Sequence, residues 1–291
     1  MSAASRQVLF ANIKRPSTAK QFARSYLSGL GLIAGISGLG SGLFPDFAKR
    51  HGVPFLIGAL ALALVYALWA AYPRLSFDRA FTMPRTKVSI VVGDLFTQDG
   101  HLVIGMTDTF DTETPQIISE RALQGQLLAR EYGGDLAALD ADVTKALAAT
   151  PVTATESRTA KPLGKLDRYP LGTVAVLGSA PRRYYGLAYS RMSNACVAES
   201  SVTNVWNSLM RLWPVVRDTA DLGTVSITAM GMGLARLSGQ ITQADIVRLI
   251  IISFLTASRE TVVTSHLRIV LSPDAAEQTD LKALRDYLNA Q

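Results

Sequence analysis

The apolar residues near the start of the chain form two long stretches without a charged residue, at 26–44 and 53–72. These stretches are 19 and 20 residues long, and the segment 45–52 separates them. At about 1.5 Å per residue, a helix of either length covers the roughly 30 Å hydrocarbon core of a bilayer. The pattern predicts a transmembrane helical hairpin over 26–72, in preference to buried helices of a soluble protein or a cleaved signal peptide.

Basic residues flank this hairpin on both outer sides. Residues 1–25 hold five cations and no acid, and residues 73–87 hold four cations against the single acid Asp78. Because cytoplasmic segments beside a membrane carry the excess of Lys and Arg, both termini are expected in the cytoplasm. The predicted organisation is a basic cytoplasmic arm at 1–25, the two-helix hairpin at 26–72, a juxtamembrane linker at 73–85 and a folded domain at 86–291, with a loop at 45–52 between the two spans.

Glycines recur at four-residue spacing in the first apolar stretch. Gly31 with Gly35, and Gly38 with Gly42, each form a GxxxG pair, which places small residues on one helix face. Glycine is also simply frequent in membrane helices. The two pairs favour a packing surface, either for the second apolar stretch or for another copy of the chain.

From residue 86 onward, strand-like and helix-like patterns alternate. Strands are expected at 87–92, 102–106, 173–177, 184–192, 225–229 and 266–271. Helices are expected at 118–132, 135–148, 198–219, 243–258 and 281–288. Residues 150–168, rich in Thr, Ala and Pro, are expected to form a surface loop. This alternation is typical of an α/β layered domain with a central sheet.

Charge and cysteine content narrow the function classes. The net charge of +6 suggests nucleic acid at first, but much of it lies beside the hairpin, where anionic lipid headgroups explain it equally well. The single cysteine, Cys196, excludes an internal disulfide and a cysteine-rich zinc site. His51, His101 and His266 show no metal-ligand spacing, so neither a metal site nor a catalytic triad is indicated.

Two glycine turns follow predicted strands, where open α/β sheets usually bind ligands. Gly93 and Asp94 follow the first strand, and a carboxylate there can accept a hydrogen bond from an adenine amino group. At 231–236, successive backbone N–H groups can face a phosphate, with which Arg236 can pair. Each segment could also be a plain turn that binds nothing.

These turns and the alternation around them resemble a macro domain, the fold that binds ADP-ribose and its relatives. The segment GMTDTFDTETPQIISERALQGQL, residues 105–127, is similar to the macro domain that follows two membrane helices in Thoeris antiphage defence effectors. The resemblance covers the whole chain in architecture and residues 87–288 in sequence pattern. It implies a macro-like domain with a mixed central sheet flanked by helices.

The resemblance implies a signal-binding effector that is not an enzyme and needs no cofactor. A TIR-domain partner would consume NAD during infection and release an ADP-ribose derivative, expected here to be histidine-ADP-ribose. The effector would bind this signal, form a homo-oligomer and disrupt the bacterial inner membrane, which leads to abortive infection. A membrane-tethered ADP-ribosyl or nucleotide hydrolase is the alternative.

The resemblance also implies ligand contacts. Asp94 matches the adenine-contacting residue, and Leu95 beside it belongs to the same expected contact. The expected diphosphate loop consists of Gly231, Met232, Gly233, Leu234 and Ala235, with Arg236 next to it.

Residues 107–112 depart from the Asn-rich segment of ADP-ribosyl hydrolases, which argues against hydrolysis. In a sensor, Asp108 or Asp111 would meet a cationic or imidazole-bearing group of the ligand, and Thr109 lies in the same expected contact segment. Phe110 either stacks on a ligand ring or belongs to the core.

Overall fold

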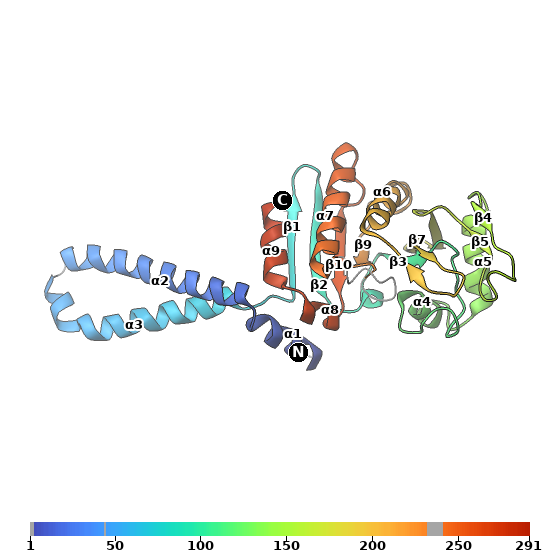
Figure 1. Cartoon of the computed structure of the whole chain (residues 1–291). Helices are drawn as coiled ribbons and strands as arrows, with labels where there is room; N and C mark the ends of the chain where they lie inside the picture. The colour runs from blue at the N-terminus through green and yellow to red at the C-terminus, as the bar shows by residue number, and fades with distance from the viewer. Residues whose placement is uncertain (1–2, 44, 232–240) are drawn as a thin grey trace. The chain divides into compact units, whose positions relative to one another are not determined.

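The computed structural model describes residues 3–43, 45–231 and 241–291. The chain divides into two compact units (Figure 1). One unit combines both ends of the chain, Met1–Leu75 and Pro273–Gln291, and the other is Ser76–Ser272. The second unit is therefore an insertion between two parts of the first.

The first unit is helical. Its described elements are α1 (Ala3–Ile13), α2 (Pro16–Leu43), α3 (Pro45–Ala71), α8 (Pro273–Gln278) and α9 (Leu281–Ala290). Figure 1 shows α2 and α3 side by side as an antiparallel pair. Ala59, Ala63 and Ala67 of α3 recur every four residues and are buried. A Cβ placed on Gly29 of α2 would lie 3.4 Å from the Ala63 Cβ, so small residues allow the close approach of the two helices.

Asn12 ties the first helix of this unit to its last two. The Asn12 Nδ2 donates to the carbonyl oxygen of Ala276 at 3.1 Å, and its Oδ1 accepts from the N–H of Leu281 at 3.1 Å. The Arg15 guanidinium donates to the carbonyl oxygen of Glu277 at 2.8 Å. In its described residues, the predicted basic arm at 1–25 thus consists of α1 and the start of α2.

Two findings bear on the predicted hairpin. In the part of the chain that the structure describes, no helix has both the length and the apolar content needed to cross a membrane. The structure therefore gives no support to the transmembrane character predicted for 26–72, although residues 26–43 are helical in α2 and residues 53–71 in α3. The predicted loop at 45–52 is wrong, because α3 begins at Pro45. Proline suits a first helical turn, where its missing N–H would have no partner.

The second unit is built on a mixed sheet, as the resemblance implied. The strand order is β1 (Ser76–Phe81), β2 (Thr86–Val92), β10 (His266–Leu271), β9 (Val225–Thr228), β3 (His101–Thr107), β7 (Arg182–Met192) and β6 (Val174–Ser179). The strands from β2 to β7 in this order are parallel, and β1 and β6 pair antiparallel at the two edges. Two short pairings accompany this sheet: β8 (Ala198–Glu199) with β7, and β4 (Ala154–Thr155) with β5 (Asp167–Arg168).

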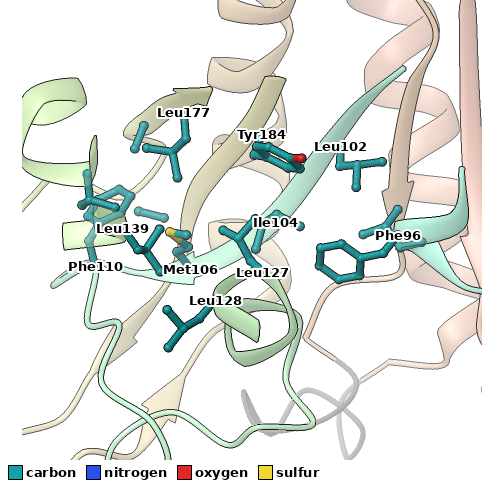
Figure 2. Packing of buried hydrophobic residues seen from close by; sticks show 14 of the residues in the cluster. Phe96, Leu102, Ile104, Met106, Phe110, Leu127, Leu128, Leu139, Leu177 and Tyr184 are labelled. Carbon is teal, nitrogen blue, oxygen red and sulfur yellow. The ribbon is translucent and has the colours of Figure 1, made fainter. Parts of the chain in front are cut away.

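Helices cover both faces of the sheet. On one face, alternate residues of β3 pack against α4 (Leu123–Glu131) and α5 (Leu136–Leu147), as Figure 2 shows. This core includes Leu102, Ile104, Met106, Leu127, Leu128 and Leu139. On the other face, α6 (Val202–Thr219) packs on β7 and on α7 (Gln243–Glu260). There Trp213 meets Phe254 edge-on at 5.4 Å between ring centroids. The alternation of side chains along β3 is what a strand buried on both faces produces.

Most predicted elements of this unit are confirmed, with four corrections. The helix predicted at 198–219 begins at Val202, because residues 198–199 pair with β7 as β8. The predicted linker at 73–85 contains β1, whose Phe77 is buried while its neighbours Ser76 and Asp78 are exposed. Helix α4 starts at Leu123 and not near 118, because Ser119 closes a separate turn, in which its carbonyl oxygen accepts from the Ala122 N–H at 2.9 Å. The predicted surface loop at 150–168 contains the short strands β4 and β5 and a fully buried lysine, Lys161.

Candidate functional site

The parallel strands place their C-terminal ends at one edge of the sheet. The N–H of Gly93, just after β2, donates to the carbonyl oxygen of Leu271 at the end of β10, at 2.9 Å. Segment 107–112 begins at the end of β3, and Gly231 follows shortly after β9. This edge therefore holds the starts of all three segments predicted to contact a ligand.

Asp94 opens a short 3₁₀ turn, η1 (Leu95–Thr97). Its Oδ1 accepts from the N–H of Phe96 at 3.0 Å, and its Oδ2 pairs with Arg130 of α4 at 2.5 Å. The Asp94 side chain is 38% exposed. Asp94 thus stabilises its own turn and still faces solvent, whereas Leu95 is buried in the core.

Arg182 of β7 stabilises this turn through hydrogen bonds to its backbone. Its guanidinium donates to the carbonyl oxygen of Gln98 at 2.7 Å and to that of Phe96 at 3.0 Å. The same guanidinium pairs with Glu131 at 3.5 Å. Sequence reasoning missed Arg130 and Arg182, because both act through contacts with residues far away in the chain. In the sequence, Arg182 stands out only as part of the basic and aromatic run at 182–185, which does not by itself indicate a ligand site.

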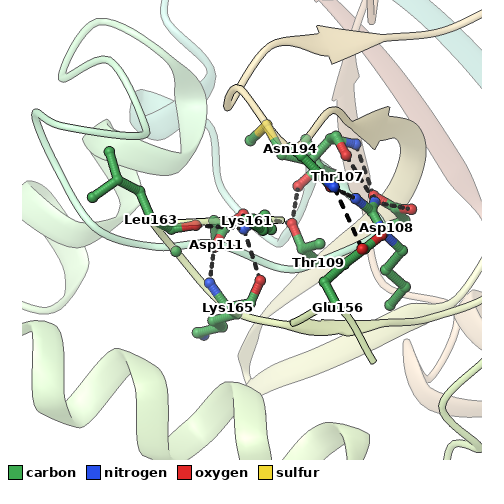
Figure 3. Close-up of polar contacts among 12 residues, drawn as sticks. Thr107, Asp108, Thr109, Asp111, Glu156, Lys161, Leu163, Lys165 and Asn194 are labelled. Carbon is green, nitrogen blue, oxygen red and sulfur yellow. Dashed lines mark hydrogen bonds and ion pairs between the residues drawn. The ribbon is translucent and has the colours of Figure 1, made fainter. Parts of the chain in front are cut away.

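The Asp108 carboxylate is enclosed by protein donors (Figure 3). Its Oδ1 accepts from the N–H of Met192 at 2.8 Å, and its Oδ2 pairs with Arg168 at 3.0 Å. Arg168 also binds Glu156 at 2.7 Å and Asn194 at 2.8 Å. Hydrogen bonding from Arg168 is the main reason that the pKa of Glu156 lies below its ordinary value.

The Asp111 carboxylate is enclosed in the same way by a buried lysine (Figure 3). Its Oδ2 pairs with Lys161 at 3.3 Å and accepts from Thr109 at 2.5 Å, and its Oδ1 accepts from the N–H of Lys165 at 2.5 Å. The Lys161 ammonium also donates to the carbonyl oxygens of Leu163 and Lys165 at 2.9 and 2.7 Å. All three ammonium hydrogens of Lys161 thus have acceptors.

These contacts correct the role predicted for segment 107–112. Asp108, Thr109, Phe110 and Asp111 are each at most 3% exposed. Both carboxylates are paired with cations of the protein, so neither is open to a cationic ligand group. Phe110 belongs to the core and meets Tyr169 edge-on at 5.7 Å between ring centroids. Of the two roles left open for Phe110, the structure selects the core.

Gly231 has a positive φ of 84°, which suits glycine. The predicted contacts Met232, Gly233, Leu234, Ala235 and Arg236 lie outside the described residues. Tyr189 of β7 forms a hydrogen bond with the Gly231 backbone. Sequence reasoning did not select this tyrosine. Burial raises the pKa of Tyr189 to about 12, against hydrogen bonds from the Gly231 backbone and Ser190. A Cβ on Gly105 would lie 2.6 Å from the Tyr189 ring, so glycine is required at 105.

The glycines predicted for helix packing are placed only in part. Gly31 and Gly35 face open space, since no atom lies within 4 Å of a Cβ built on either. Neither residue is therefore the one that contacts α3 in this structure. The surroundings of Gly38 and Gly42 lie outside the described part of the chain.

Several solved structures are similar to this chain at low identity. A mutant Oceanobacillus iheyensis macrodomain with ADPR has a TM-score of 0.45 and 11% identity, with 74% of this chain and 100% of that chain covered. The same macrodomain with ADP has a TM-score of 0.40 and 11% identity, covering 73% and 98%. A tomato leucine aminopeptidase mutant has a TM-score of 0.43 and 12% identity, covering 74% and 37%. No curated protein matches the chain.

A protein-family model gives a more specific result. The model described as the macro domain of the Thoeris protein ThsA matches residues 88–272, which is more than half of the chain. The matched region begins in β2 and ends directly after β10, so it includes the parallel strands and the edge described above. The chain belongs to the ThsA macro-domain family of Thoeris proteins.

Proposed function

We propose that this chain is an antiphage effector whose macro domain binds an ADP-ribose-derived signal at the C-terminal edge of the sheet. The family match over residues 88–272 carries the proposal. The signal is made by a TIR-domain partner, and histidine-ADP-ribose is the form that the sequence resemblance favours. Asp94 contacts the adenine, and the segment that starts at Gly231 contacts the diphosphate.

The state of the carboxylates at this edge favours signal binding over hydrolysis. A general base must present a free oxygen to water or to the substrate. Asp108 and Asp111 are buried and paired with Arg168 and Lys161, so neither is available for that role. The hydrolase alternative would have to use a different group.

The output of the effector is proposed to be homo-oligomer formation and disruption of the inner membrane by the α2–α3 hairpin. Apolar side chains of α3 are exposed in the single chain, among them Ile57 (63%), Leu62 (67%), Val65 (63%) and Trp69 (67%). Exposed apolar surface of this kind marks contact with lipid or with other protein copies. Ligand-driven contact between macro domains would raise the local concentration of hairpins and favour their assembly.

Calorimetry of the full chain with ADP-ribose, cyclic ADP-ribose and histidine-ADP-ribose tests this function, with each mixture assayed for ligand breakdown. We expect one intact ligand to bind, to lose at least tenfold in affinity in Asp94→Ala, and to trigger leakage from lipid vesicles that hold the chain. Asp135→Ala is the matched control, since Asp135 also caps a helix, at 2.9 Å from the Ala138 N–H.

The outcomes separate the hypotheses. Ligand breakdown would support the hydrolase hypothesis and contradict the sensor hypothesis. Binding without vesicle leakage would remove the membrane output and leave the sensor in place. Failure of every ligand to bind would contradict the proposed function as a whole.

A further inference from the structure

Arg130 holds an unusual position beside the Asp94 turn. Its Nη1 pairs with Asp94 Oδ2 at 2.5 Å, and its guanidinium carbon lies 5.3 Å from the centroid of the Phe96 ring. Phe96 is only 8% exposed, whereas the Arg130 side chain is 45% exposed. The guanidinium therefore rests on an aromatic ring that the fold buries, and it keeps a solvent-facing side.

Asp94 retains capacity to accept further hydrogen bonds. A carboxylate offers about four lone-pair positions. The Phe96 N–H takes one of these positions and Arg130 takes another. A purine amino group can therefore bond to Asp94 without displacing Arg130. A base held in this way lies beside the guanidinium, and guanidinium groups stack favourably on flat aromatic rings.

We propose that Arg130 is a base-binding residue that stacks on the purine base of the ligand, while Asp94 accepts the amino group of that base and provides the selectivity for it. This inference rests on the proposed function. The guanidinium would then lie between the base and Phe96, whose ring centroid is already 5.3 Å from the Arg130 guanidinium carbon. The site therefore selects a flat base that carries an exocyclic amino group, independently of the group at the far end of the ligand.

The test compares two ligands and three variants of the full chain by calorimetry. The ligands are ADP-ribose and its hypoxanthine counterpart, in which a carbonyl oxygen replaces the amino group. Arg130→Lys keeps the charge beside Asp94 but removes the flat group, and Asp94→Asn removes the carboxylate. Arg217→Lys is the control, since Arg217 is also partly exposed and pairs with an aspartate, Asp218, at 3.1 Å.

We expect Arg130→Lys to weaken both ligands alike by about tenfold, close to 1.4 kcal/mol, and to leave their ratio unchanged. Asp94→Asn should instead change the ratio. Unchanged affinity in Arg130→Lys would overturn the proposal. Weakening of ADP-ribose alone would also overturn it, because Arg130 would then act only through Asp94. If the wild type binds neither these ligands nor the other ADP-ribose derivatives, the proposed function itself fails. Thermal melting confirms that each variant is folded.

Discussion

Two acidic segments at the same edge of the sheet differ in what surrounds them. Asp94, after β2, pairs with one cation and is 38% exposed. Asp111, after β3, accepts from two hydrogen-bond donors besides its buried lysine and is 1% exposed. Both have the residue type and the strand-end position that predict a ligand contact. Only Asp94 has accessible oxygen lone pairs left for a ligand.

The difference shows that the Asp111 carboxylate serves the structure, whereas the Asp94 carboxylate is left accessible for the recognition proposed above. An ion pair without solvent depends on both partners, because removing one leaves the other charge buried and unpaired. A half-exposed pair contributes little, because water screens it. The same aspartate-to-alanine change should therefore cost much more stability at Asp111 than at Asp94.

The largest expected effect is the stability of Asp111→Ala. Because Lys161 would keep a buried charge without its carboxylate, we expect a loss of roughly 3–5 kcal/mol in the free energy of unfolding. Asp94→Ala removes a cap and should cost only about 1 kcal/mol. Urea unfolding followed by circular dichroism measures both losses. The double variant Asp111→Leu with Lys161→Met should recover much of the loss expected for Asp111→Ala. Equal losses in Asp111→Ala and Asp94→Ala would contradict the comparison.

A smaller effect is expected at Gly164, which closes the turn around the Lys161 ammonium. Gly164 has a φ of 75°, and a Cβ there would lie 2.4 Å from Asp111 Oδ1 and 2.7 Å from Lys161 Nζ. Gly133 has a φ of 60° but open space around it. Gly133→Ala should therefore cost about 1 kcal/mol for backbone conformation alone, and Gly164→Ala should cost about 1–3 kcal/mol more because the buried pair must move. Thermal melting of the two variants tests this, and similar melting temperatures would mean that the Lys161 turn adapts freely.

The smallest expected effect concerns pH at the opposite end of β3. His101 is buried, and its ring nitrogens lie 3.1 Å from the Ala220 carbonyl oxygen and 3.1 Å from the Arg183 N–H, which suits the neutral ring. Burial is the main cause that lowers the pKa of His101 below 6.5. This stabilisation is complete above about pH 6.5 and is lost as the pH falls through the lowered pKa. Melting temperatures from pH 8 to pH 5 should fall less steeply in His101→Gln than in the wild type. An identical slope would exclude His101 as the titrating group.

The sequence predicted the regular elements of the second unit because their apolar periodicity is strong. Helix α6 illustrates this, since its buried residues recur at helical spacing and Ser201 caps its start at 3.1 Å from the Asn204 N–H. Strand β1 was missed because its only buried aromatic, Phe77, is surrounded by exposed or partly exposed residues. Sequence periodicity detects an apolar face, and an edge strand has little of one.

The state of the candidate site could be predicted only in part. The Gly-Asp turn was located from its place after a strand. The burial of Asp111 depends on Lys161, 50 residues further along the chain. A lysine in a polar segment normally indicates exposure, and here its own turn supplies two carbonyl acceptors that make burial possible. No local pattern encodes that arrangement.

The insertion of the second unit has a consequence for where the chain crosses its boundary. The chain enters this unit at Ser76, which pairs with Val91, and leaves it after Leu271, which pairs with Val92. The two crossings therefore flank the end of β2 on its two sides, directly before Gly93 and Asp94. A molecule bound at Asp94 would lie close in the sequence and in the sheet to both points at which the chain passes from one unit to the other.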